Sequence, residues 1–160
     1  MNDSSARRDA IRALLRSQPV AALGTLHRGQ PFVSMVPYAL LPDGEGVVIH
    51  VSRLASHTRD MERSPRVSLM VAASPSTEVP VRALARLTIQ GDAAPCPAAD
   101  PRHEAARQAY LGRFAASAEL FGFADFSLFV VRPVSARWVG GFGQAVSLLA
   151  PAVVDALRTG

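Results

Sequence analysis

Residues 20–51 read VAALGTLHRGQPFVSMVPYALLPDGEGVVIHV, and this stretch decides the fold class. It contains three mainly apolar runs, separated by two short polar segments with glycine at residues 27–30 and 42–46. Segments of this composition form the tight turns of β-hairpins. Because the two turns lie only about fifteen residues apart, no helix fits between the strands. The stretch therefore predicts an antiparallel meander and not βαβ units.

The rest of the chain continues in the same way. Further strands are predicted at 67–73, 81–90, 126–131 and 135–139, and helices at 3–17, 52–63, 100–114 and weakly at 148–160. Six or seven strands with short helices between them favour a mainly β (α+β) fold, an antiparallel β-barrel with short peripheral helices. The 160 residues suit a single domain, with an N-terminal helix in residues 1–18 and a C-terminal tail in residues 145–160.

Composition excludes several functions. The chain has no lysine, so neither a Schiff base to pyridoxal phosphate nor a P-loop lysine is available. The net charge is +4, but the arginines are scattered, which argues against a nucleic-acid partner. The four histidines lack metal-ligand spacing and Cys96 is the single cysteine, so we expect no protein-built metal site. The polar N-terminus and the short apolar runs predict a cytoplasmic protein with no membrane segment.

Residues 31–38, PFVSMVPY, form the first of three segments with ligand-binding potential. A proline inside an apolar strand removes a ladder donor, which is typical of an edge strand or a bulge. The backbone of such a strand offers N–H and C=O groups to a planar heterocycle. A core strand with an edge proline explains the same residues, and the segment taken alone favours this second interpretation.

The second segment, residues 50–59, reads HVSRLASHTR and lies where a strand turns into a helix. It contains three hydroxyl groups, two arginines and two histidines. Helix N-termini attract phosphate groups through free N–H groups and the helix dipole. The alternative is an N-capping serine with solvated arginines around it, and residue types alone do not separate the two.

The third segment, residues 137–143, reads RWVGGFG and contains the only tryptophan. Its glycines let a backbone or a ligand approach closely. A Rossmann phosphate loop is excluded, because Val146 occupies the position of the third glycine and too little chain follows for a βαβ unit. A buried tryptophan before a loose turn is the alternative.

Together these segments resemble the pyridoxamine 5′-phosphate oxidase-like superfamily of FMN-binding split barrels, and within it the branch related to haem utilisation. The resemblance runs from about residue 20 to residue 144. It is most specific in residues 49–69, with IHVS, SHTR and SPRVSL, and continues in LARLTIQGDA at 84–93 and WVGG at 138–141. It implies a homodimer with two FMN sites at the subunit interface.

The resemblance also implies which residues would bind the cofactor. Along the flavin-binding strand these are Ser34, Met35 and Val36; around the FMN phosphate and ribityl chain they are Val51, Ser52, Ser56 and His57; Arg86 replaces a flavin-contacting glutamine, and Trp138 comes from the second subunit. The oxidases usually have an arginine and a lysine where Ser56 and His57 stand, so His57 would take the place of the lysine. No catalytic acid or base is identified.

Two departures limit what the resemblance implies. The oxidases carry an R-x-H pair for their substrate after W-x-G-G, whereas residues 142–146 read FGQAV, so the chain is not expected to be a true pyridoxamine 5′-phosphate oxidase. Haem-degrading relatives need a histidine near their carboxyl end, and the last histidine here is His103. The main expectation is an FMN-dependent oxidoreductase of unknown substrate. The alternatives are a haem-binding or haem-degrading protein, with His50 or His57 as the ligand, and a flavin-binding module without turnover.

Overall fold

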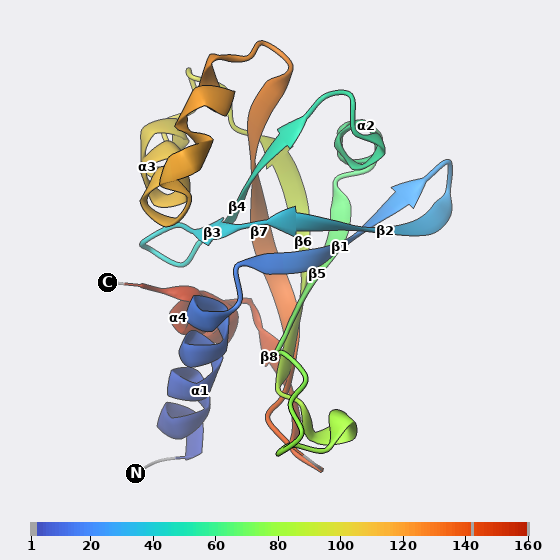
Figure 1. Cartoon of the computed structure of the whole chain (residues 1–160), viewed down its shortest axis with the longest axis vertical. Coiled ribbons are helices and arrows are strands. Elements are labelled where there is room, and N and C mark those ends of the chain that lie inside the picture. The colour runs from blue at the N-terminus through green and yellow to red at the C-terminus, as the bar shows by residue number, and fades with distance from the viewer. Residues whose placement is uncertain (1–2, 142, 160) are drawn as a thin grey trace.

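The computed structural model describes residues 3–141 and 143–159 (Figure 1). Met1, Asn2, Phe142 and Gly160 lie outside the described residues, and with them part of the polar N-terminus and one position of the FGQAV stretch. In chain order the elements are α1 (Asp3–Ser17), β1 (Val20–His27), β2 (Gln30–Pro37), β3 (Ala39–Leu40), β4 (Val47–Ser52), α2 (Ser56–Arg63), β5 (Arg66–Ala72), the 3₁₀ turn η1 (Val81–Ala83), β6 (Arg86–Pro95), α3 (His103–Arg113), the 3₁₀ segment η2 (Ala115–Gly122), β7 (Phe126–Val139), β8 (Ala145–Leu149) and α4 (Ala150–Leu157).

The strands form one antiparallel sheet in the order β2-β1-β5-β6-β7-β4-β3, with β8 paired to β7. Figure 1 shows the sheet curling around its own axis, with α1 and α4 side by side near one end and α2 and α3 near the other. The predicted mainly β split-barrel fold is confirmed, and the described residues form eight strands in place of the predicted six or seven.

The hairpin β1–β2 forms as the sequence predicts. Arg28 and Gly29 both have positive φ angles, 51° and 78°, which is the conformation of a type I′ turn. In the resulting register Leu23 lies opposite Ser34 and Ala22 lies opposite Met35. Because paired residues share a face of the sheet and neighbours alternate, Ser34 points to the inside of the curled sheet and Met35 to the outside.

The prediction of two separate strands at 126–131 and 135–139 is wrong, because β7 runs unbroken from Phe126 to Val139. Its first half pairs with β4 and its second half with β8, while β6 follows it on the other side. A bulge joins the two halves, since Gly91 pairs with Pro133 and Gln90 with Ser135.

Two further boundaries differ from the sequence-based expectation. The residues at 81–83 form a 3₁₀ turn and not the start of a strand. Gly91 does not end β6, which continues to Pro95. A Cβ atom at residue 91 would lie 2.5 Å from the carbonyl oxygen of Arg132, so glycine allows the two strands to pass closely at the bulge.

The core has two parts, which lie on the two faces of β4. Val47, Ile49 and Val51 belong to the larger cluster inside the curled sheet, which α1 and α4 close. Val48 belongs to a smaller cluster between β4 and α3. Strand β4 is therefore covered on both faces, and this explains its continuous apolar run. Among the described residues, no helix is both long and apolar enough to cross a bilayer.

Candidate functional site

Ser52 ends β4 and shapes the loop that leads into α2. Its hydroxyl donates to Asp125 Oδ2 at 3.1 Å and accepts the N–H of Leu54 at 3.1 Å. Its carbonyl oxygen accepts from the hydroxyl of Thr58 at 2.7 Å. Ser52 is thus the turn residue of this loop, while Ala55 is the N-cap of α2 and no side chain caps the helix. The N–H groups of the first turn of α2 are left without a side-chain partner.

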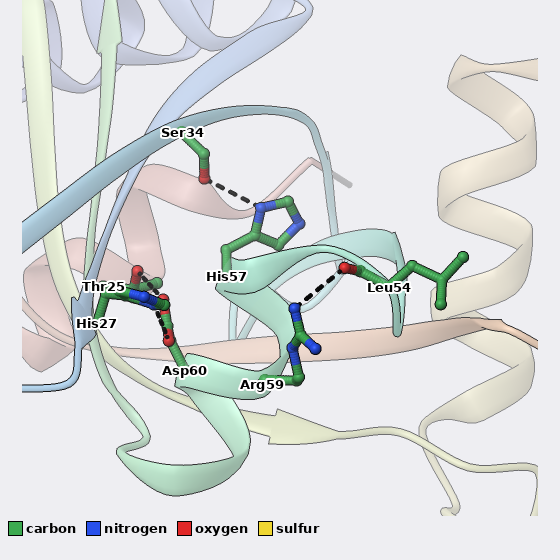
Figure 2. A network of polar contacts seen from close by, with 7 residues as sticks. All are labelled: Thr25, His27, Ser34, Leu54, His57, Arg59 and Asp60. Carbon is green, nitrogen blue, oxygen red and sulfur yellow. Dashed lines mark hydrogen bonds and ion pairs between the residues drawn. The ribbon is translucent and has the colours of Figure 1, made fainter.

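His57 lies in this first turn, next to β2. Figure 2 shows its ring and the Ser34 side chain pointing toward one another, with His57 Nδ1 3.1 Å from Ser34 Oγ. Burial lowers the pKa of His57, and the negative charge of Asp60 offsets this only in part. The imidazole is therefore neutral at pH 7. Its Nε2 atom makes no hydrogen bond within residues 3–141 and 143–159, so one ring nitrogen is held and the other is available.

Asp60, which the sequence did not indicate, joins α2 to β1. Its carboxylate is only 1% exposed. Thr25 Oγ1 donates to Oδ2 at 3.1 Å, and His27 Nδ1 lies 2.9 Å from Oδ1 (Figure 2). The signal was present in β1, where the inward positions change from apolar at residues 21 and 23 to polar at 25 and 27. A buried carboxylate needs such partners, and here they fix α2 to the end of the barrel.

The structure brings only some of the predicted cofactor residues together. Ser34, Ser52, Ser56 and His57 lie at the α2 end of the barrel. Val36 and Val51 are core residues that are 2% and 4% exposed, whereas Met35 is 65% exposed on the outer face.

Arg86 and Trp138 lie at the opposite end of β6 and β7. The Trp138 side chain is buried in the core of the chain and is 5% exposed. Arg86 Nη1 donates to the carbonyl oxygen of Leu84 at 3.1 Å. The contact of Arg86 with a cofactor, and that of Trp138 with the cofactor of a second subunit, stay predictions.

His50 belongs to a different site from His57, although the sequence places both in one segment. Its side chain projects from the other face of β4 and stacks on Phe121, with ring centroids 3.9 Å apart and planes 8° apart. It is 7% exposed, and its Nδ1 atom has no hydrogen-bond partner among the described residues. Burial lowers the pKa of His50 to about 4. Phe121 thus covers a neutral ring, and His57 is the more accessible of the two.

We expect Asp60→Asn to lower the pKa of His57 further. The Asp60 carboxylate favours the imidazolium form of His57, so its neutralisation removes the one influence that raises this pKa. NMR titration of the histidine rings would measure the shift. Glu62→Gln, an exposed position on the same helix, is the control and should leave the His57 titration unchanged. An unchanged His57 pKa in Asp60→Asn would show that the two groups are not coupled.

Residues 8–140 match the family described as pyridoxamine 5′-phosphate oxidase, and the chain belongs to this family. A solved structure of a heme binding protein from Mycobacterium smegmatis superposes with a TM-score of 0.82 at 36% identity, covering 92% of this chain and 60% of that one. The chloroplastic heme oxygenase HOZ of Arabidopsis thaliana is 34% identical over 140 residues, 86% of this chain and 41% of the relative. Heme oxygenase HutZ of Vibrio cholerae is 29% identical over 136 residues, 80% of this chain and 72% of the relative. The chain thus spans less than half of the chloroplast protein.

These relatives overturn the main functional expectation. All three are named for haem, so the FMN-dependent oxidoreductase is wrong as the principal function and FMN is not supported as the cofactor. The site gives a physical reason. The Ser52 hydroxyl is engaged in the loop, and a neutral His57 supplies no charge for a phosphate group.

Proposed function

We propose that this chain binds haem at the α2 end of the barrel and promotes its oxidative degradation. The observation that carries the proposal is the His57 side chain, a neutral imidazole held at Nδ1 by Ser34 with Nε2 available. Neutral imidazole is a common ligand of haem iron. Similarity to proteins named heme oxygenase and heme binding protein supports the same ligand.

The residues around His57 fit a flat, apolar dianion. Leu54 lies just before α2 and is 77% exposed. Phe32 lies in β2, is 43% exposed and has its ring next to that of His27. Exposed apolar side chains of this kind pack against a macrocycle. Arg53 and Arg59 are exposed on the same loop and helix, and guanidinium groups bind carboxylates such as the haem propionates.

In this proposal haem is the substrate, and its iron supplies the oxygen chemistry that opens the ring. The chain's own residues hold His57 in the orientation in which it would bind the iron. Ser34 holds the His57 ring, and Asp60 ties the helix that carries His57 to β1. Such outer contacts fix the orientation of a metal ligand.

The turnover experiment incubates the haem-loaded protein with oxygen and ascorbate as reductant. We expect the Soret band to decay faster than that of free haem under the same conditions, with a linear tetrapyrrole detected by mass spectrometry. Haem that binds but stays intact would contradict the degradation part of the proposal. Protein that takes up no haem would contradict all of it.

We also propose that the chain forms a homodimer through the outer face of the sheet. In this face Met35, Ala22 and Met70 lie side by side, and the next row contains Val33 and Gly24. Val33 and Met35 are 66% and 65% exposed and Met70 is 41% exposed. A contiguous apolar face of this kind favours association with a second protein surface.

We expect Val33→Glu to convert the dimer into a monomer, weakening association by about a hundredfold or more because a charge would be buried in an apolar interface. Light scattering coupled to size-exclusion chromatography would measure this. Val81→Glu is the control, since Val81 is 74% exposed but lies outside the sheet. A wild-type chain that stays monomeric at high concentration would contradict the proposal.

A further inference from the structure

A cavity of about 520 Å³ lies where α1, α3 and α4 meet β3, away from α2. Its wall includes the apolar side chains of Leu15, Leu40 and Leu157, of which Leu15 and Leu157 are almost fully buried. Four arginines, Arg12, Arg16, Arg113 and Arg158, also line it, and the acidic side chain among the lining residues is Asp9. The charged lining residues therefore carry a formal net charge of +3. A cavity of this size holds a small organic molecule.

Within residues 3–141 and 143–159, the four arginines donate hydrogen bonds to backbone carbonyl oxygens and to no carboxylate. Arg113 Nη2 donates to three carbonyl oxygens at the end of α1, those of Leu15, Arg16 and Gln18, at 2.8, 3.3 and 2.7 Å. Arg12 Nη2 donates to the carbonyl oxygen of Asp155 at 2.7 Å. Arg16 and Arg158 donate through Nε to the carbonyl oxygens of Arg12 and Asp43, each at 3.3 Å.

All these acceptors are neutral backbone oxygens, and the ion pairs found within the described part of the chain include none of the four arginines. Arg12 Nε is in addition buried without a hydrogen-bond partner among the described residues. Arg113 is held rigidly, because its guanidinium also lies 4.7 Å from the centre of the Tyr38 ring. Guanidinium groups that form no ion pair within the described residues, with Arg113 held in place beside an apolar floor, suit an anion that carries an apolar body.

We propose that this cavity binds an organic carboxylate with an apolar chain or ring, at a site separate from the haem site. The carboxylate lies among the guanidinium groups and the apolar part lies against Leu15, Leu40 and Leu157. Gly112 of α3 lines the cavity, and a Cβ atom there would meet no other atom within 4 Å. A side chain at residue 112 therefore has room at the wall of the cavity without disturbing the backbone, and we expect a large one to occupy part of the cavity.

Isothermal titration of the full chain with octanoate tests the site. We expect a dissociation constant of about 1 mM or tighter, and binding of octan-1-ol, which has no charge, that is at least about tenfold weaker. Gly112→Leu should remove octanoate binding by filling the cavity. Ala105→Leu adds the same side chain at an exposed position of the same helix and should leave binding unchanged. The double variant Arg16→Gln, Arg158→Gln should weaken octanoate by about tenfold or more and octan-1-ol much less.

No octanoate binding by the wild-type chain, equal losses in the two leucine variants, or an unchanged affinity in the arginine variant would each overturn the proposal. Haem titration of Gly112→Leu shows whether the cavity and the proposed haem site are independent of each other. We expect haem affinity to be unchanged in that variant. Octanoate binding that Gly112→Leu abolishes supports the site whether or not the chain binds haem.

Discussion

Replacing His57 with alanine is expected to weaken haem binding by about a hundredfold, equivalent to about 2.7 kcal/mol. The structure leaves Nε2 of a neutral imidazole free at the α2 end, so the alanine variant loses the iron ligand while keeping the apolar and guanidinium contacts. The Soret maximum of the residual complex should also shift, because the axial ligand sets the spectrum of haem iron. Titration followed by absorbance measures both effects.

Two matched variants separate ligation from a general structural effect. His103→Ala removes a histidine whose Nδ1 lies 2.7 Å from the carbonyl oxygen of Cys96, far along the chain from α2, and it should leave haem binding unchanged. Ser34→Ala keeps the ligand but frees its ring, so a smaller loss than in His57→Ala, of about tenfold, is expected. Equal losses in His57→Ala and His103→Ala would show that His57 does not coordinate the iron.

Acid should destabilise the protein through His50. Burial lowers the pKa of His50 from 6.5 to about 4, so between these values the unfolded chain binds a proton that the folded chain does not. Protonation of His50 therefore does not affect the free energy of unfolding above about pH 6.5. As the pH decreases from 6.5 toward 4, the free energy of unfolding falls by at most about 1.4 kcal/mol per pH unit. Denaturant unfolding at a series of pH values would measure the slope.

His50→Phe supplies the control for this pH dependence. Phenylalanine keeps an aromatic ring against Phe121 and removes the titrating group. The free energy of unfolding of this variant should fall less steeply between pH 6.5 and 4. The difference in slope should be at most that of one bound proton, about 1.4 kcal/mol per pH unit. If wild type and His50→Phe lose stability in parallel over this range, the pKa of His50 is not lowered in the folded state.

Local sequence signals predicted the parts of the fold that depend on neighbours along the chain. The β1–β2 turn needs two residues with positive φ, and Arg28-Gly29 supplies them. The continuity of β7 was not predictable, because it depends on a bulge opposite Gly91 of another strand. The separation of His50 from His57 was likewise not predictable. It arises because β4 is covered on both faces and His50 lies on the face that packs against α3 and η2.

The ligand was harder to predict than the fold. The resemblance correctly indicated the family and its haem-related branch. The FMN ligand that it also implied is wrong, because the same fold can bind different ligands. The deciding features are tertiary. Ser52 is used within its own loop, and the charge state of His57 depends on burial and on Asp60, which lies three residues further along α2.

The central claim is that haem, and not FMN, is the ligand of this chain. Its most direct test is parallel titration of the purified, ligand-free protein with haem and with FMN, followed by absorbance and by flavin fluorescence. We expect haem to saturate one site per chain with a dissociation constant below about 1 µM, and FMN to bind at least about a hundredfold more weakly. Tight FMN binding together with no saturable haem binding would contradict the account.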